Sequence, residues 1–268
     1  MKGNIWLYTV CWNEIDILPF VVDYWKRFAQ TVIVYDNGST DGTLEFLKKF
    51  DWIEVRSFET DGFNDIVHMR IKNEVWKEAR GKADFVVVCD MDECLYSPVL
   101  EEEMEYMLEN GFTICGPEQY ALVGDNYPEY KDNMLLHEII TRVRLQKSNH
   151  TPHLITTGKL MLFNPNAIKE INYSAGCHTA NPIGNVKLYD RKQIFCIHIN
   201  RGFGVDYNIR RVREYEKRLS NTNKKYKLGI HYTFSDEEII RNYQNGIKNS
   251  LNIMDVLAKF SANNKHGK

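Results

Sequence analysis

The chain has 268 residues, enough for one large α/β domain or two small ones. Its formal net charge is -2, so no basic field points to nucleic acid as a partner. The six cysteines form no CxxC pair, and several lie in apolar runs, which is typical of reduced core residues in a cytoplasmic protein.

No segment predicts export or a membrane span. Met1-Lys2-Gly3-Asn4 leads directly into a short strand, so we expect no signal peptide. No apolar run approaches the roughly 20 residues that a spanning helix needs. The 15 Tyr, 13 Phe and 5 Trp residues exceed what a core usually needs, and this surplus is compatible with a peripheral contact with a membrane.

The first 95 residues alternate between short apolar runs and helical patterns. The apolar runs predict strands at 5–10, 31–35, 52–58 and 85–88. Apolar residues at helical spacing predict helices near 16–28, 43–50 and 65–79. This alternation predicts an α/β fold whose mostly parallel sheet has right-handed crossovers and flanking helices.

Polar side chains follow each of these strands at its carboxyl end. They are Asn13 and Glu14, Asp36, Glu59 and Asp61, and Asp90 and Asp92. Open α/β sheets bind their ligands at this edge. The pattern therefore predicts a nucleotide-type crevice, although neither GxGxxG nor GxxxxGK[ST] is present.

Asp90 and Asp92 follow the buried strand at 85–88. Successive strand residues point to opposite faces, so these two carboxylates share a side. Two hard oxygen ligands on one side suit Mg²⁺ or Mn²⁺, and a diphosphate can complete the shell. An acidic turn after a strand is the alternative, because Asp-x-Asp alone is a common sequence.

The sequence after residue 95 is less regular. Ser97-Pro98 and the acids at 101–103 predict a helix that Gly111 ends. Further strands are predicted at 112–123, 138–146, 153–163, 187–189 and 195–199, and helices at 206–219 and 235–260. No linker divides the chain, so we predict one domain, residues 1–268, that ends in a helical segment.

Four motifs occur in order along the chain: Asn13-Glu14, the loop DNGSTDGT at 36–43, Lys72-Asn73 and Asp90-x-Asp92. In this combination the sequence resembles glycosyltransferase family 2, especially a branch with an Asn-Glu start and a DNGSTDGT loop. The resemblance covers the first 95 residues well and 157–200 loosely. It implies the GT-A fold and metal-dependent transfer of a sugar from a nucleotide-sugar donor, expected to be a UDP-sugar.

The same resemblance implies a glycan or lipid-linked acceptor and a role in surface polysaccharide or glycoconjugate synthesis. Residues 1–95 would form the half that binds the nucleotide sugar, and residues 96–268 the half that binds the acceptor. The enzyme would work in the cytoplasm, at the inner face of the membrane.

The resemblance also implies roles for single residues. Asp36 would accept a hydrogen bond from the nucleotide base, and capping of its own turn is the alternative. Asp90 would face the ribose or the metal. Asp92 would hold the catalytic metal, Mn²⁺ or Mg²⁺, which offsets charge on the leaving diphosphate. The other nucleotide-binding residues would be Asn13 and Glu14 beside the base and ribose, and Asn73 with Lys72 or Arg70.

Related sugar transferases often supply one late histidine to the same metal. His178 lies in the small polar segment Ala175-Gly176-Cys177-His178, which has little drive toward helix or strand. We expect His178 to be this ligand. His198 is the competitor, but its apolar run at 195–199 favours a hydrogen-bonded core histidine.

No motif identifies the general base. Many inverting members use an acidic pair after the sheet, and this sequence contains no Glu-Asp pair. Glu118 is the first candidate, and a solvated loop acid is its alternative. The other candidates are Asp125, Glu138 and Asp206. An inverting outcome is therefore implied by the resemblance alone.

Aromatic and basic residues late in the chain are expected to hold the acceptor. They are Arg201, Phe203, Tyr207, Arg210 and Arg211. Gly202 and Gly204 flank Phe203, so this loop can move and close over the donor. Arginine forks match the phosphate of an anionic acceptor. A solvated basic helix, balanced by Glu214 and Glu216, is the alternative.

Two other functions compete with this interpretation. A nucleotidyltransferase of the same fold would need a glycine-rich basic loop after the first strand, where the sequence has Cys11-Trp12-Asn13-Glu14. A non-catalytic protein that binds sugars or nucleotides would need no metal site for a diphosphate. Turnover of a nucleotide sugar would exclude the second.

Overall fold

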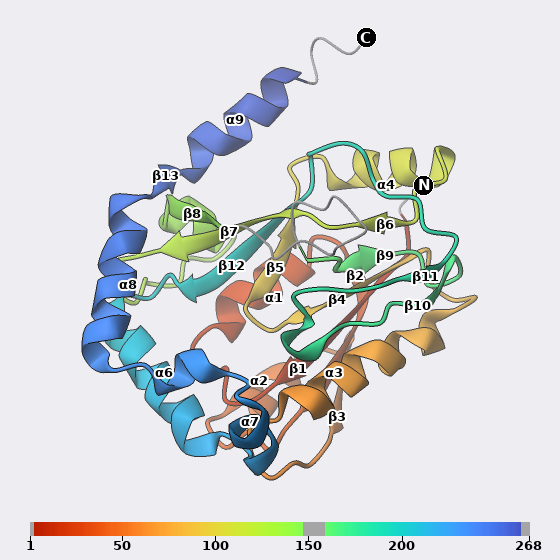
Figure 1. Cartoon of the computed structure of the whole chain (residues 1–268). Coiled ribbons are helices and arrows are strands. Elements are labelled where there is room, and N and C mark those ends of the chain that lie inside the picture. The colour runs from red at the N-terminus through yellow and green to blue at the C-terminus, as the bar shows by residue number, and fades with distance from the viewer. Residues whose placement is uncertain (1–2, 147–158, 264–268) are drawn as a thin grey trace.

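The computed structural model describes residues 3–146 and 159–263. Its first sheet has the strand order β3-β2-β1-β4-β9-β6 (Figure 1). The bounds are β1 Ile5–Cys11, β2 Ala29–Asp36, β3 Ile53–Ser57, β4 Phe85–Asp90, β6 Ile114–Cys115 and β9 Leu162–Phe163. The strands β1 to β4 are parallel, and β9 runs antiparallel to β4 and β6. The predicted parallel sheet is confirmed.

Strand register brings the predicted polar residues to one edge. The strand β1 lies between β2 and β4, where Cys11 pairs with Asp36 and Val10 pairs with Asp90. Parallel strands end at the same edge of a sheet. Asp36 and Asp90 therefore flank the end of β1 from its two neighbours.

Helices join the parallel strands as predicted. They are α1 Leu18–Trp25, α2 Thr43–Leu47, α3 Asp65–Glu74 and the 3₁₀ helix η1 Val75–Ala79. Pro19 lies in the first turn of α1, where its missing N–H leaves no helical bond unmade. Asn64 caps α3 by accepting the N–H of Val67 at 3.2 Å.

A second sheet, which the sequence did not predict, has the order β13-β8-β7-β12-β5. Its strands are β5 Glu93–Tyr96, β7 Glu118–Val123, β8 Arg142–Gln146, β12 Phe195–Arg201 and β13 Leu251–Asn252. The predicted strand at 112–123 contributes β6 to the first sheet and β7 to the second. Gly116-Pro117 separates the two pieces, because proline cannot donate to a sheet ladder.

Other predicted elements differ from the structure. The strand at 138–146 is the helix α5 Leu136–Ile139 followed by β8. The strand at 187–189 is wrong, since Leu188 makes only an isolated bridge to Ile114. Part of the strand at 153–163 lies outside the described residues, and β9 is what the described part contains. The helix α4 Leu100–Glu109 is confirmed, with its acids in the first turn.

Helices form the later part of the chain. They are α6 Val205–Arg218, α7 Asn221–Tyr226, the 3₁₀ helix η3 Ile230–Thr233, α8 Asp236–Lys248 and α9 Ile253–Asn263. The closing helix predicted at 235–260 is divided because β13 pairs with β8 between α8 and α9. In Figure 1, α6, α7 and α8 lie along one side of the molecule and α9 projects away from it.

Smaller elements complete the loop region next to α3. The strands β10 Ile168–Glu170 and β11 Ile183–Gly184 pair antiparallel, and the 3₁₀ helix η2 Ala175–Cys177 lies between them in sequence. Among residues 3–146 and 159–263, no helix has both the length and the apolar character that crossing a membrane requires.

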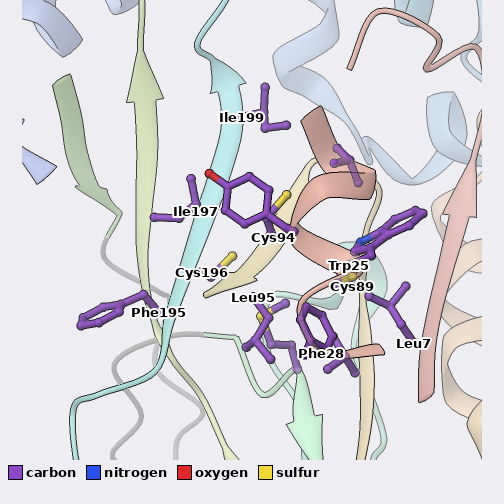
Figure 2. Close-up of a cluster of buried hydrophobic side chains, with 14 of the residues drawn as sticks. Leu7, Trp25, Phe28, Cys89, Cys94, Leu95, Phe195, Cys196, Ile197 and Ile199 are labelled. Atoms are coloured by element: carbon purple, nitrogen blue, oxygen red, sulfur yellow. The ribbon is translucent and has the colours of Figure 1, made fainter. Parts of the chain in front are cut away.

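One hydrophobic cluster joins the two sheets through α1 (Figure 2). It contains Leu7 and Cys89 from the first sheet, Trp25 from α1, and Leu95 and Ile197 from the second sheet. Trp25 is completely buried, and truncation of such a side chain to alanine typically costs about 3–5 kcal/mol. The two sheets therefore share packing, while the division into one domain with two halves stays a prediction.

Candidate active site

A cavity of about 640 Å³ lies at the carboxyl ends of β1 and β4. From the first 95 residues it is lined by Trp12, Glu14, Asp65, Lys72, Asp90 and Asp92, among others. From the later part it is lined by His178, His198, Tyr207, Arg211, Tyr215, His231 and Tyr232, among others. The cavity thus lies between the predicted edge of the sheet and the segment from α6 to η3.

Asp90 is held by two buried lysines. Its Oδ1 accepts from the ammonium of Lys72, and its Oδ2 accepts from Lys159 Nζ at 2.7 Å. Burial disfavours the Asp90 carboxylate, but the two ammonium groups outweigh burial and hold its pKa well below the usual range. Asp90 is therefore an ionised group whose two oxygens are both already engaged.

Lys159 also reaches a third acid that the sequence did not single out. Its Nζ donates to Glu93 Oε2 at 2.7 Å, and the same oxygen accepts the N–H of Asp90 at 3.0 Å. Glu93 Oε1 accepts from Gln119 at 3.1 Å. Burial opposes the charge of Lys159, but Asp90 and Glu93 raise its pKa well above the usual value. Two buried lysines, the buried Glu93 and the partly exposed Asp90 thus form a charged network beside the cavity.

Asp92 pairs with His198. Asp92 Oδ2 lies 3.0 Å from His198 Nε2, and His198 Nδ1 lies 2.8 Å from Gln146 Oε1. Burial opposes the charge of the imidazole, but Asp92 raises the pKa of His198. His198 is hydrogen-bonded, as the core interpretation expects, but it is only partly buried and lines the cavity.

The metal-ligand set predicted from the sequence is not assembled. In the part of the chain that the structure describes, no three His, Cys, Asp or Glu side chains gather as a metal-binding group. Asp90 is engaged by lysines, and His178 is an exposed residue of the cavity wall. Asp92 and His198 are adjacent oxygen and nitrogen donors. A metal ion on them would replace the proton that lies between Asp92 Oδ2 and His198 Nε2, and a diphosphate would complete its shell.

Asp36 is 1% exposed and shapes the loop that follows β2. Its Oδ2 accepts the N–H groups of Gly38 and Ser39 at 2.9 and 3.1 Å, as turn capping predicted. Its Oδ1 is buried and has no hydrogen-bond partner among the described residues. A buried oxygen of this kind costs free energy unless a ligand satisfies it. One carboxylate oxygen of Asp36 thus caps the turn, and the other can accept a hydrogen bond from a ligand.

Asn13 supports the same loop from β1. Its backbone has a φ of 49°, and its Oδ1 accepts the N–H of Thr40 at 2.7 Å. Its own N–H donates to Ser39 Oγ at 2.8 Å. The side chain therefore positions the 36–43 loop.

Glu14 is tied to α6. Its Oε1 accepts from Arg211 Nη2 at 2.8 Å and from the Tyr215 hydroxyl at 3.0 Å. Burial raises the pKa of Glu14 to about 8, although Arg211 opposes this shift. The contact joins the motif after β1 to a helix almost 200 residues later in the sequence and closes one wall of the cavity.

The chain matches the family model of glycosyl transferase family 2 over residues 7–171. It belongs to that family. The family and the observed sheet together confirm the predicted GT-A fold. The comparison with curated proteins gave no match.

Among solved structures, the chain is similar to TarS of S. aureus, at 13% identity and a TM-score of 0.42 over 91% of this chain and 43% of that one. The chain thus spans less than half of that TarS chain. TarS 1–349 has 13% identity and a TM-score of 0.46, over 91% of this chain and 71% of that one. Its complex with UDP has 14% identity and a TM-score of 0.44, over 87% of this chain and 72% of that one.

Several predicted site residues of this family 2 protein lie away from the cavity. Asn73 is engaged by a backbone segment, since it accepts the N–H of Tyr173 at 2.7 Å and donates to its carbonyl at 3.2 Å. Arg70 is exposed on α3 and is not among the described lining residues. The structure therefore brings Lys72, but neither Arg70 nor Asn73, to the cavity.

The candidate bases also lie elsewhere. Glu118 begins β7 beside Phe195, three residues before His198 on β12, and accepts from the Tyr120 hydroxyl at 2.9 Å. Asp125 pairs with Arg142, and Glu138 accepts the N–H of Leu135. None of these three acids, nor the exposed Asp206, is a described lining residue of the cavity. The identity of the general base stays a prediction, and Glu118 lies at the start of β7, level with Phe195 of β12.

The predicted acceptor residues separate into different environments. Phe203 is 2% exposed and packs against Phe20 and Tyr127, with ring centroids 5.4 and 4.7 Å apart. It is therefore a core residue and does not face an acceptor. Tyr207 and Arg211 line the cavity.

Of the other two predicted acceptor residues, Arg210 is not among the described lining residues of the cavity. Arg210 is exposed and pairs with Asp16. The side chain of Arg201 lies outside the described residues. The α6 helix is thus a cavity wall on one side and a solvated basic helix on the other.

Proposed function

We propose that this family 2 protein transfers a sugar from a UDP-sugar to a glycan or lipid-linked acceptor, with inversion at the anomeric carbon. The observation that carries the proposal is the arrangement at one sheet edge of Asp36 Oδ1, a buried acceptor without a partner among the described residues, and of a donor pair, Asp92 and His198. The first suits a base N–H, and the second suits a metal ion on a diphosphate.

Charge in the cavity supports diphosphate binding. The ammonium of Lys72 faces the cavity while Asp90 keeps it charged and in place. Asp92 and His198 would hold Mn²⁺ or Mg²⁺, which offsets the charge that develops on the leaving diphosphate. His198 thereby replaces His178 as the proposed nitrogen ligand.

The wall opposite the sheet is the proposed acceptor side. Tyr207 from α6 and Asn242 from α8 line it, and phenol and amide groups hydrogen-bond sugar hydroxyls. We place the reaction in surface polysaccharide or glycoconjugate synthesis, in the cytoplasm at the inner face of the membrane. All six cysteines are buried thiols without disulfides, which fits a reducing compartment.

The test is a screen of nucleotide sugars by thermal shift and product analysis, with Mn²⁺ or with EDTA. We expect one UDP-sugar to stabilise the protein only when Mn²⁺ is present and to be turned over. Asp92→Asn should keep the fold but lose metal-dependent UDP binding, whereas Asp51→Asn, at an exposed turn, should change neither. Tight binding without turnover would indicate a non-catalytic binding protein. Release of diphosphate from a nucleoside triphosphate would indicate a nucleotidyltransferase.

A further inference from the structure

Arg218 ends α6, beyond the residues that the family model matches. Its guanidinium carbon lies 4.2 Å from the ring centroid of Trp12, which lines the cavity. Its Nη2 donates to both the backbone carbonyl and the side-chain oxygen of Asn37. Arg218 thus reaches from the far end of the chain to the residue next to Asp36.

The two charged groups leave complementary atoms unused. Arg218 Nη1 is a buried donor with no hydrogen-bond partner among the described residues. Asp36 Oδ1 is a buried acceptor that likewise has no partner among them. Burial lowers the pKa of the Arg218 guanidinium, and Asp36 is one of the groups that oppose this shift. Asp36 is buried and Arg218 is half-buried, and a buried polar atom that makes no hydrogen bond costs free energy until a ligand satisfies it.

Backbone contacts hold Arg218 in this place. The N–H of Phe63 donates to the carbonyl of Arg218 at 2.6 Å, and the N–H of Ser220 donates to the carbonyl of Phe63 at 3.0 Å. Gly62 has a φ of 122°, and a Cβ there would lie 2.1 Å from the Arg218 carbonyl oxygen. The end of α6 is therefore locked against the loop after β3, so the side chain's reach toward Asp36 is built into the fold.

We propose that Arg218 determines the base specificity of the donor site by donating Nη1–H to a base carbonyl while Asp36 Oδ1 accepts the neighbouring base N–H. The inference rests on the proposed function and identifies the nucleotide base as the part of the donor that Arg218 and Asp36 recognise. Uracil has this arrangement, with N3–H between two carbonyl groups. The Trp12 ring, which lies against the Arg218 guanidinium, lines the cavity. In cytosine N3 carries no hydrogen and lies between the C2 carbonyl and the C4 amine. Cytosine therefore has no carbonyl directly beside an N–H on this edge.

The experiment measures Kd by calorimetry, with Mn²⁺, for UDP, N3-methyl-UDP, CDP and the base-free probe ribose 5-diphosphate. For Arg218→Met we expect UDP to bind about 10- to 100-fold more weakly, the usual loss of a hydrogen bond to a charged group. Ribose 5-diphosphate should bind as it does to the natural protein. The matched control is Arg213→Met, on the same helix, whose guanidinium pairs with Asp236 and Glu216 away from the cavity.

Ligand changes test the idea without any variant. N3-methyl-UDP and CDP should both bind the natural protein at least about tenfold more weakly than UDP. Equal weakening of UDP and ribose 5-diphosphate by Arg218→Met would overturn the proposal, since Arg218 would then serve the diphosphate or the fold. Unchanged UDP binding by that variant would overturn it too. If the natural protein binds none of the four probes, the proposed function fails as well, a result distinct from both of these.

Discussion

Removing the ammonium of Lys159 should destabilise the protein strongly. The Lys159 side chain is 2% exposed and bonds to Asp90 and to Glu93, whose side chain is 3% exposed. Lys159→Met would leave Glu93 as a buried carboxylate without a cation. Breaking a buried pair by removing one partner costs about 3–5 kcal/mol. At about 2–4 °C per kcal/mol, this corresponds to a fall in Tm of roughly 6–20 °C.

The assay is thermal and urea unfolding followed by circular dichroism. Lys77→Met is the matched control, because the carboxylates that pair with Lys77, Glu74 and Glu170, are exposed and each pair should contribute only about 0–1 kcal/mol. Adding Glu93→Gln to Lys159→Met should restore part of the loss, since the unpaired charge disappears. A Lys159→Met protein as stable as the Lys77→Met control, or no recovery in the double variant, would refute this account of the network.

Three further outcomes are expected. Between about pH 5 and 8 the folded state keeps a proton on Glu14 that the unfolded state has lost, so the free energy of unfolding should fall by up to about 1.4 kcal/mol per pH unit. Glu14→Gln should flatten this fall, and an unchanged slope of the free energy of unfolding against pH would contradict the prediction. His198→Gln should weaken Mn²⁺-dependent UDP binding far more than His178→Gln, measured by calorimetry, and the reverse order would restore His178 as the ligand. Phe203→Ala should cost about 3–5 kcal/mol in urea unfolding, whereas a raised acceptor KM at full stability would support its original assignment.

The parallel half of the fold could be predicted from the sequence because each unit is local. A strand, its helix and the next strand fall within about 30 residues, so periodicity alone orders them. The polar residues after each strand then follow from register, as for Asp36 and Asp90 beside β1.

The charged network could not be predicted in the same way. Lys159 is a single lysine in an apolar run, and nothing local indicates that it meets Asp90, 69 residues earlier. Glu93 directly follows the Asp-x-Asp motif, so the sequence indicates that it lies near Asp92. The sequence does not indicate that Glu93 pairs with Lys159. Glu93 also accepts a hydrogen bond from Gln119 of β7 in the second sheet, a pairing between distant segments.

The environments of His198 and Phe203 could not be predicted, for related reasons. An apolar run indicates that the strand around His198 is buried, but it does not indicate that one face of that strand meets Asp92. The glycines around Phe203 were interpreted as a hinge. In the structure a Cβ on Gly204 would lie 2.3 Å from the carbonyl oxygen of Asp125. Glycine is required there because the backbone of Asp125 packs closely against it, and it does not indicate a mobile loop.

The position of β12 also constrains how the protein can be made. It pairs with β5 on one side and β7 on the other, yet it is synthesised about 100 residues after β5, a separation that slows folding through loop closure. Until Arg201 has left the ribosome, the second sheet lacks the strand that joins β5 to β7. The nascent chain must therefore keep two unpaired strand edges beside an already foldable parallel half, and such edges are where aggregation and chaperone binding begin.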